Sequence, residues 1–242
     1  MPQKKIDEIT LTFGTYMNPG IFNKDFVKGL KYLKNFDQKR FNKYNKILLA
    51  ISWFSKKLLR YELYFSKFYN ENISDTEALE HHVNSYLQDT EALKNKLLNY
   101  LGSLKNDLKK IYVNKEDIEK VYKHLSSQIE KSFKKVTLLS TEHRHGNFRF
   151  LDSDLIEAQT MSMLLEQKNI LPLSAQGINL VNARLEESLK KSKDRWIKNA
   201  NNNESQIIGV VEETLERTED MLYKAVGIEK VIFNNISQNE IN

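Results

Sequence analysis

The stretch Thr141-Glu-His-Arg-His-Gly-Asn-Phe-Arg-Phe-Leu-Asp-Ser-Asp154 divides two long runs of helical sequence pattern, and we expect the chain to turn there. Before it, apolar residues recur every three or four positions over 118–139, which predicts an amphipathic helix. At its end, Asp152-Ser-Asp154 is typical of a helix start, because these side chains bind backbone N–H groups that lack helical partners. The stretch also gathers two histidines and two arginines, so a chemical site is expected here before anywhere else.

On the N-terminal side, the pattern predicts further helices. Ser74-Asp-Thr-Glu77 is a capping box, in which Ser and Glu bind each other's backbone N–H groups, and a long helix is expected from there to about Tyr112. An earlier helix is expected over 23–69, with a break near Asp37. Its apolar positions cover most of the circumference over 47–68, which predicts a central, buried helix. Its aromatic residues are expected in the core, with stacking on nucleic-acid bases as the alternative.

On the C-terminal side, the helix that follows the central stretch is expected to end before Pro172, and Ser174 is expected to cap the next one. Asn199-Ala-Asn-Asn-Asn203 predicts a loop, because asparagine favours turns. A last helix is expected to stop at Gly227, since glycine adopts the left-handed conformation that commonly follows a helix end.

Composition favours an all-α fold class. The 242 residues include eight glycines and three prolines, and no proline lies between Pro19 and Pro172. Helix breakers are therefore rare, whereas a β-sandwich or barrel needs many turn residues. We expect an up-and-down bundle of long helices with a C-terminal helical hairpin and at most one short two-stranded ribbon, made by strands within 6–13 and 228–233. The expected parts are an irregular or extended N-terminal arm over 1–23, a helical bundle over 24–171 and the C-terminal hairpin over 172–242.

The chain has no cysteine, so disulfides and thiolate metal sites are excluded and a cytoplasmic location is expected. No apolar run reaches the roughly 20 residues that cross a bilayer, and no signal peptide is evident, so no membrane partner is expected.

The net charge is +5, with a basic stretch over 24–67 and an acidic one over 204–229. Either these two ends attract each other within the fold or a dimer, or the basic face binds an anionic ligand such as RNA.

The motif Glu142-His-Arg-His-Gly-Asn147 combines two functions that RNA cleavage needs. An imidazole transfers protons near neutral pH, and a guanidinium binds phosphate through two N–H groups. The pair therefore predicts a metal-independent ribonuclease site with no cofactor. The alternative is structural, with Arg144 bound to the carbonyl groups that end the preceding helix. The predicted catalytic residues are Glu142, His143, Arg144 and His145, and the predicted nucleic-acid-binding residues are Lys134, Lys135, Asn147 and Arg149.

The order of helices around this motif resembles the HEPN superfamily (higher eukaryotes and prokaryotes nucleotide-binding domain). The likeness covers about residues 40–170 and rests on two long helices, a third ending in an Arg-polar pair, a short loop and a fourth helix. In that family an Arg followed by Asn, His or Asp precedes a His by four to six residues, and dimers often form a composite RNase site in toxin and anti-phage defence systems. Arg144 and His145 match the first half of the motif. The second histidine is missing, since residues 148–150 are Phe-Arg-Phe.

The resemblance implies an RNA- or nucleotide-binding homodimer. It would be either an endoribonuclease in which His143 or His145 takes the missing role, or a catalytically degenerate member of the family. Two other functions fit the sequence. A non-catalytic scaffold or regulator would dock a protein partner through its acidic C-terminal hairpin or its basic helix. A membrane-surface module would use the basic face over 24–67.

Overall fold

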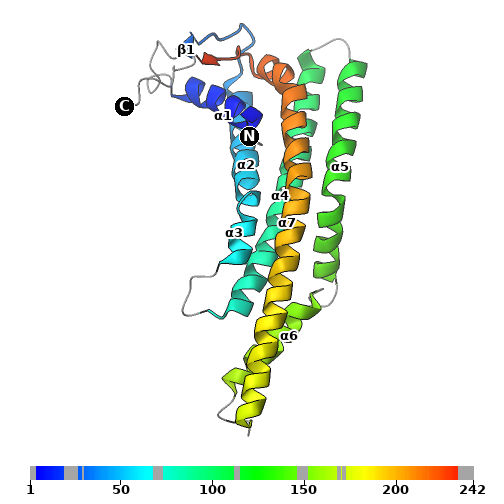
Figure 1. The fold of residues 1–242 in the computed structure, drawn as a ribbon. Coiled ribbons are helices and arrows are strands. Elements are labelled where there is room, and N and C mark those ends of the chain that lie inside the picture. The colour runs from blue at the N-terminus through cyan, green and yellow to red at the C-terminus, as the bar shows by residue number, and fades with distance from the viewer. Residues whose placement is uncertain are drawn as a thin grey trace, which may run out of the picture. The chain divides into compact units, whose positions relative to one another are not determined.

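In the residues that it describes, the computed structural model is all-α apart from one antiparallel ribbon, whose two strands have two residues each (Figure 1). These residues are 4–18, 27–28, 30–67, 73–111, 115–145, 152–167, 170 and 173–233, with the backbone alone for 27–28, 142–145 and 232–233. The elements in chain order are α1 (Lys4–Met17), β1 (Val27–Lys28), α2 (Gln38–Leu58), α3 (Tyr61–Ser66), α4 (Asp75–Ile111), α5 (Lys115–His145), α6 (Ser153–Glu166), α7 (Ala175–Val226) and β2 (Ile232–Phe233). The predicted fold class, a bundle of long helices with at most one short ribbon, is confirmed.

The chain forms two compact units, each built from several separate segments. Unit 1 comprises residues 1–55, 93–132 and 207–242, and unit 2 comprises residues 56–92 and 133–206. The long helices α4, α5 and α7 contribute residues to both units.

Aromatic side chains lie in the core of each unit, but the aromatic residues predicted to be buried over 47–69 divide: Tyr61 and Phe65 are fully buried, whereas Trp53 is 57% exposed. In unit 1, Phe13 stacks on Phe41 with ring centroids 4.7 Å apart. In unit 2, the ring of Phe65 lies near those of Tyr86 and Trp196, at centroid distances of 5.8 and 6.2 Å. Burial of such large rings contributes much of the free energy that packs helices together.

The helix expected to be buried on several sides is instead divided and open on one face. The chain turns at residues 59–60, so the segment forms α2 and the short α3 rather than one helix. On α2, Leu49 and Trp53 are 49% and 57% exposed. They lie four residues apart and hence on one face of the helix. The apolar run in the sequence therefore overstated how much of this helix is covered.

The helix boundaries that were predicted from capping chemistry are confirmed. The N–H of Ser74 donates to the Glu77 carboxylate (3.1 Å) and the N–H of Glu77 donates to Ser74 Oγ (3.3 Å), which completes the capping box of α4. At the start of α7, the N–H of Gly177 donates to Ser174 Oγ (3.1 Å). After the end of α7, Gly227 has a φ of 77°, a left-handed conformation that glycine adopts without a Cβ clash.

The prediction of an irregular or extended N-terminal arm is wrong for the residues that form α1. The buried apolar residues of this helix, Ile6, Ile9, Phe13 and Tyr16, follow a three- and four-residue spacing, and Thr12 and Thr15 are buried beside them. Leu11, which suggested a strand by alternating with its apolar neighbours, is 39% exposed. The helical period decides the structure here, because the alternating pattern covers too few residues to outweigh it.

No helix forms in the described residues between α1 and α2, so the helix predicted from residue 23 onward is wrong in its first part. The N–H of Leu33 donates to the carbonyl oxygen of Gly227 (2.9 Å). This bond with the end of α7 uses an N–H group that a helix would need. α2 begins after Asp37, whose carboxylate accepts from the N–H of Arg40 (2.9 Å) as a helix cap, in agreement with the predicted break.

The strand predicted within residues 228–233 is confirmed as β2, but its partner is not the predicted one. β2 pairs antiparallel with β1, with Phe233 opposite Val27 and Ile232 opposite Lys28. The strand predicted within residues 6–13 is wrong, because those residues belong to α1.

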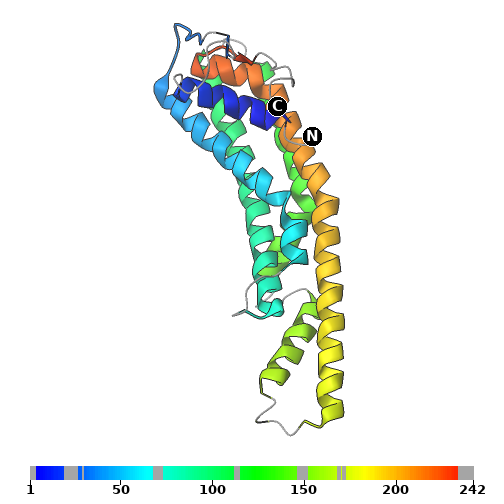
Figure 2. The same ribbon diagram turned by 60° about the vertical axis from the view of Figure 1, so that its left-hand side comes forward.

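The loop predicted at residues 199–203 is also wrong, because α7 runs without interruption from Ala175 to Val226 (Figure 2). The C-terminal segment is therefore one helix and not the predicted hairpin. Asn203 is buried, and its amide donates to the carbonyl oxygen of Asn199 (2.7 Å) and to the hydroxyl of Tyr86 (3.4 Å). These partners stabilise an asparagine at a helical position where its intrinsic preference alone predicts a turn.

Candidate functional site

The predicted catalytic motif lies at the C-terminal end of α5, which extends to His145. The structure describes the backbone of residues 142–145 but not their side chains, so the arrangement of the predicted catalytic groups stays a prediction. Asn147 and Arg149, which were predicted to bind nucleic acid, lie outside the described residues. The Arg-His pair thus belongs to the last turn of a helix, where backbone carbonyl groups lack helical partners.

Two of the predicted nucleic-acid-binding residues are described. Lys134 and Lys135 lie on α5 and are exposed. Neither forms an ion pair within the part of the chain that the structure describes. One turn later, Leu138 is 52% exposed, and Thr141 is exposed as well. This face of α5 is therefore open and basic in the turns that precede the Arg-His pair.

On the other side of the motif, a buried carboxylate in unit 2 anchors the chain. Asp152 is 1% exposed and is the N-cap of α6, where its Oδ1 accepts from the N–H groups of Asp154 (3.1 Å) and Leu155 (3.2 Å). Its Oδ2 accepts from Ser192 Oγ (2.6 Å) and Trp196 Nε1 (2.8 Å), both on α7. The carboxylate therefore joins the first turn of α6 to α7.

Arg195 completes this anchor. Its guanidinium donates to the carboxylates of Asp152 and Asp154 through separate nitrogens, while its side chain remains 42% exposed. The ion pair between Arg195 and Asp152 compensates the negative charge of this buried carboxylate. Since both oxygens of Asp152 accept from protein groups, this residue positions the start of α6 and is not directed at a ligand.

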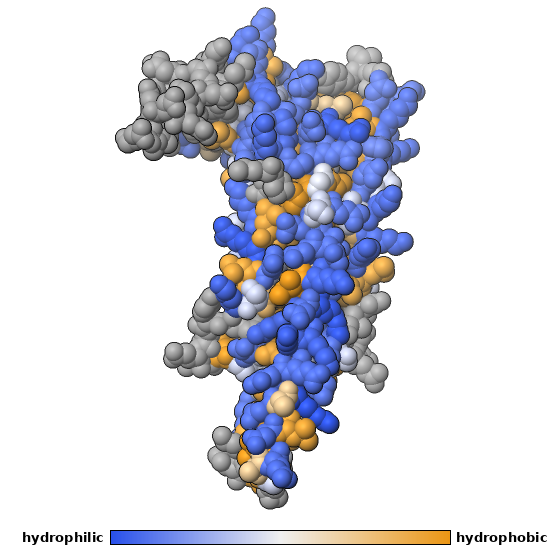
Figure 3. Space-filling model, viewed as in Figure 1, coloured by the Kyte–Doolittle hydropathy of each residue, from blue (hydrophilic) through white to orange (hydrophobic). Residues whose placement is uncertain are grey.

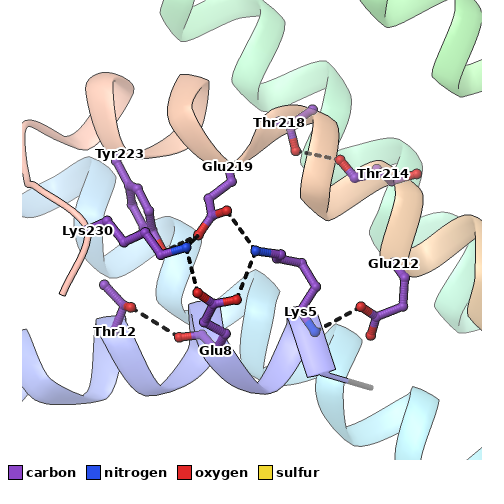
Figure 4. A network of polar contacts seen from close by, with 9 residues as sticks. All are labelled: Lys5, Glu8, Thr12, Glu212, Thr214, Thr218, Glu219, Tyr223 and Lys230. Atoms are coloured by element: carbon purple, nitrogen blue, oxygen red, sulfur yellow. Dashed lines mark hydrogen bonds and ion pairs between the residues drawn. The ribbon is translucent and has the colours of Figure 1, made fainter. Parts of the chain in front are cut away.

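A second polar cluster lies in unit 1, outside the predicted site (Figure 4). Lys5 of α1 bonds Glu8 (2.8 Å) and Glu219 (2.9 Å), and Lys230 bonds the same two carboxylates (2.5 and 3.1 Å). Burial alone would lower the pKa of Lys5, but its hydrogen bonds to Glu8 and Glu219 outweigh burial and raise that pKa. Burial would raise the pKa of Glu8, but Lys230 and Lys5 hold it below its usual value. Lys5 and Glu8 therefore stay charged at neutral pH, and the cluster holds α1 against the end of α7.

Glu212 of α7 extends this cluster as a cap for α1 (Figure 4). Its Oε2 accepts from the backbone N–H of Lys5 (2.9 Å), whereas its Oε1 is buried with no hydrogen-bond partner in the described part of the chain. Burial raises the pKa of this carboxyl group. The side chain lies at the N-terminal end of α1, where the helix dipole favours a negative charge, so its role is structural.

Two further buried carboxylates lie on α4, one in each unit, and sequence reasoning missed both. In unit 1, Asp107 accepts from the Tyr44 hydroxyl (2.9 Å) and pairs with Lys43. In unit 2, Asp89 accepts from the Tyr61 hydroxyl and pairs with a lysine of α2 (2.6 Å). The available signal was an acidic residue within the apolar spacing of a predicted helix. Each acid is already paired with a cation and a phenol, so neither is free to act as a general base.

Within the described ranges, no group of three or more His, Asp or Glu side chains is placed to hold a metal ion. Among the helices that the structure describes, none combines the length and apolarity that spanning a bilayer requires.

A shallow hollow of about 600 Å³ runs along α2. It is lined by Gln38, Lys39, Asn42, Lys43 and Lys46. Its open shape differs from the concave, mostly apolar clefts that bind small molecules.

The comparisons with known proteins return no match: no family model, no curated protein and no solved structure matches this chain. The likeness to the HEPN superfamily therefore rests on helix order and on Arg144-His145.

Proposed function

We propose that this chain is a HEPN-like helical protein that binds RNA at the end of α5. The observation that carries the proposal is the open basic face of this helix. Lys134 and Lys135 are exposed and form no ion pair among the described residues. Lysine side chains bind phosphate oxygens whatever the base sequence, and such contacts position a nucleic-acid strand.

The spacing along α5 places one residue of the Arg-His pair on the same face as a lysine. His145 follows Lys134 by eleven positions, which is three turns or about 16 Å along a helix, so these two positions share a face. Arg144 follows Lys135 by nine positions, or two and a half turns, so these two positions lie on opposite sides of the helix.

The anchor at Asp152 supports the proposal from the other side of the motif. It fixes the first turn of α6 to α7 through a buried carboxylate, so the chain that follows the Arg-His pair has a firm attachment. Groups that are held before a ligand binds lose less conformational entropy when it does bind.

RNA cleavage is a finer proposal on the same residues. An imidazole would remove the proton of the 2′-hydroxyl, whose oxygen attacks the adjacent phosphorus. The bond to the 5′-oxygen then breaks, which leaves a cyclic phosphate and a 5′-hydroxyl that takes up a proton. The motif offers His143 and His145 for these two proton transfers, and Arg144 for the developing negative charge. The second histidine of the family motif is missing, which bears on cleavage alone. The binding proposal rests on the lysines and Arg144, so it does not depend on cleavage.

Fluorescence polarisation with labelled single-stranded RNA tests the binding proposal on the purified 242-residue chain. The variant Lys134→Glu/Lys135→Glu is expected to bind roughly tenfold more weakly or worse, because two phosphate contacts are lost and two repulsive charges are added. The control Lys198→Glu/Lys224→Glu makes the same charge change at exposed positions of α7 and is expected to bind like the wild type. A wild type that binds no RNA, or equal weakening in both variants, would refute the site.

Incubation of labelled RNA in the presence of EDTA, followed on a denaturing gel, tests the cleavage proposal. We expect the wild type to shorten the RNA without a metal ion, and Arg144→Ala to abolish shortening while some binding remains. Intact RNA with the wild type, together with normal binding, would leave an RNA-binding protein without nuclease activity.

A protein-interaction module is the second candidate function. The exposed apolar residues of α6 and α7 favour it, with Met163 and Leu180 58% and 57% exposed. This function would be favoured over the first if the chain bound no RNA but bound one purified protein partner with a dissociation constant below about 1 μM.

A further inference from the structure

In unit 1, one face of α2 carries a row of exposed residues that begins with lysines and ends with an aromatic ring. The row consists of Lys39, Asn42, Lys46, Leu49 and Trp53 (the α2 face), which recur at intervals of three and four positions and are all exposed. At 3.6 residues per turn, these positions lie within about 80° of the helix circumference. The opposite side of the helix packs into the core.

The positive charge of the α2 face is not neutralised within the fold. The helix carries no acidic residue over Gln38–Leu58. Arg40 and Lys43 form ion pairs with acids of neighbouring segments, whereas Lys39 and Lys46 form none within the described part of the chain. Both of these lysines line the open hollow of about 600 Å³ along the helix. An open, lysine-lined hollow suits a polyanion that enters and leaves at its two ends.

Trp53 adds an aromatic surface to this basic row. It lies seven positions after Lys46, which is about 10 Å further along the same face. Its ring meets that of Phe54 edge to face, with centroids 4.8 Å apart. Since the two rings do not stack, this contact covers at most one face of the indole. Proteins that bind single-stranded nucleic acid combine such aromatic rings, on which bases stack, with a basic surface that follows the phosphates.

We propose that the α2 face binds single-stranded nucleic acid, with Lys39 and Lys46 on phosphates and Trp53 stacked on a base. Charges lie about 3.4 Å apart along one nucleic-acid chain, so about 10 Å between successive contacts spans about three nucleotides. In a duplex the bases are stacked and paired, and an indole on a helix surface does not reach their faces. The site is inferred from α2 alone and does not rest on RNA binding at the end of α5.

A membrane surface also attracts lysine and tryptophan, but the apolar part of the α2 face is too small for it. An interfacial helix buries a broad apolar face in the lipid. On α2, the exposed large apolar residues are Leu49 and Trp53. On the side of the molecule drawn in Figure 3, hydrophilic surface predominates outside the grey residues, and the orange, apolar surface is divided into separate patches. One indole face is sufficient for one base.

Two labelled DNA strands of equal charge separate base stacking from charge attraction in fluorescence polarisation. One is an oligothymidylate of about 12 nucleotides, and the other is an abasic strand of the same length. We expect the wild type to bind the oligothymidylate at least about fivefold more tightly, and Trp53→Ala to bind both strands equally. The control Leu11→Ala changes an exposed apolar residue of α1 and should keep the preference. A wild type without preference, or loss of preference in both variants, would overturn the proposal.

Tryptophan fluorescence reports the same contact in the unaltered protein. The chain has two tryptophans, and Trp196 is buried, so quenching by a stacked base is expected from Trp53 alone. Saturating oligothymidylate should quench the emission, whereas the abasic strand should not. Lys134→Glu/Lys135→Glu should show the same quenching, because these lysines belong to α5. Loss of quenching in that variant would mean that α2 is not a separate site.

The salt dependence of oligothymidylate binding tests the two lysines. Lys39→Ala/Lys46→Ala removes two phosphate contacts, so the slope of log K against log salt concentration should become less steep by about 1.4, or about 0.7 for each contact. The control Lys115→Ala/Lys224→Ala changes exposed lysines elsewhere in unit 1 and should keep the wild-type slope. Equal slopes in all three proteins would count against the α2 face. So would a wild type that binds neither strand but sediments with phosphatidylserine vesicles through Trp53.

Discussion

Replacing Asp152 with alanine removes the side chain that joins the start of α6 to α7. The first turn of α6 then loses its N-cap. The indole N–H of Trp196 and the hydroxyl of Ser192, which both donate to this carboxylate in buried positions, lose their acceptor. The guanidinium of Arg195 loses one partner but is 42% exposed, so water can replace that contact.

The expected loss follows from these contacts. An N-cap contributes about 1 kcal/mol. A buried donor without an acceptor costs about 1–3 kcal/mol, and the Trp196 N–H has a fixed direction and no alternative. The Ser192 hydroxyl rotates toward a carbonyl of the preceding helical turn, so its contribution is small. The exposed contact with Arg195 adds less than about 1 kcal/mol. Asp152→Ala should therefore lower stability by about 2–4 kcal/mol, at the upper end for single substitutions.

Hydrogen–deuterium exchange at the amides of α6 measures this loss where it occurs. A loss of about 3 kcal/mol makes local opening roughly a hundredfold more frequent, because each 1.4 kcal/mol is about a factor of ten. Asp154→Ala is the matched control, since it removes the contact with Arg195 and leaves the buried bonds intact. Its exchange should change by less than about fivefold.

Equal acceleration of exchange by Asp152→Ala and Asp154→Ala would refute the reasoning, because the buried bonds would then add nothing to the exposed one. A double-mutant cycle sharpens the result. When Trp196→Phe removes the indole N–H as well, that buried donor is no longer left without an acceptor, so the double variant should lose less stability than the two single variants added together. Strict additivity would mean that Asp152 and Trp196 do not interact.

Three further perturbations test the fold. Gly227→Ala should lower the urea midpoint by the equivalent of more than about 1 kcal/mol, since φ is +77° and a Cβ there would lie 2.4 Å from the backbone nitrogen of Phe36. Ser74→Ala removes the N-cap of α4 and should cost about 1 kcal/mol in the same assay. Burial would raise the pKa of Asp107, but the Lys43 ammonium and the Tyr44 hydroxyl hold it below its usual value of 3.8. Its stabilising effect is therefore present above pH 3.8 and lost as the pH falls further, so Asp107→Asn should flatten the acid limb of stability against pH.

Helix boundaries could be predicted where the deciding contacts lie within a few residues in sequence. Ser74 and Glu77 cap α4 across three positions, and Asp152 caps α6 through N–H groups two and three residues away. Gly227 ends α7 through its own backbone conformation. Such contacts leave a readable signature, since they depend on residue type at a fixed spacing.

Predictions failed where a distant segment supplies the partner. Leu33 lies in a pattern that favours a helix, yet its N–H bonds Gly227, which lies far along the chain. Asn203 lies in a run that favours a turn, yet its amide bonds Tyr86 and its position is helical. Neither partner is visible in a local window of sequence, so tertiary structure overrides local preference at both places.

The candidate site shows the same division. Its place at the end of a helix, before a new cap at Asp152, could be predicted from residue types and spacing. The donors that hold Asp152, at Ser192 and Trp196, follow 40 and 44 residues later and could not. The sequence did contain one usable sign. Ser192 and Trp196 are four residues apart and therefore lie on one face of a predicted helix. Because a buried indole N–H needs an acceptor, a face of this kind is expected to meet one.

Buried polar pairs explain why α7 keeps one register over 52 residues. Apolar residues that recur every three or four positions bury a similar surface when a helix slides by seven residues, so they do not select a register by themselves. In unit 2, the indole of Trp196 meets Asp152, and in unit 1 the hydroxyl of Thr218 lies 2.8 Å from that of Tyr100. A shift of seven residues would leave these groups buried without partners, at about 1–3 kcal/mol each. The polar residues that interrupt the helical pattern of the sequence, Asn203 among them, are therefore the ones that select the position of this helix against its neighbours in each unit.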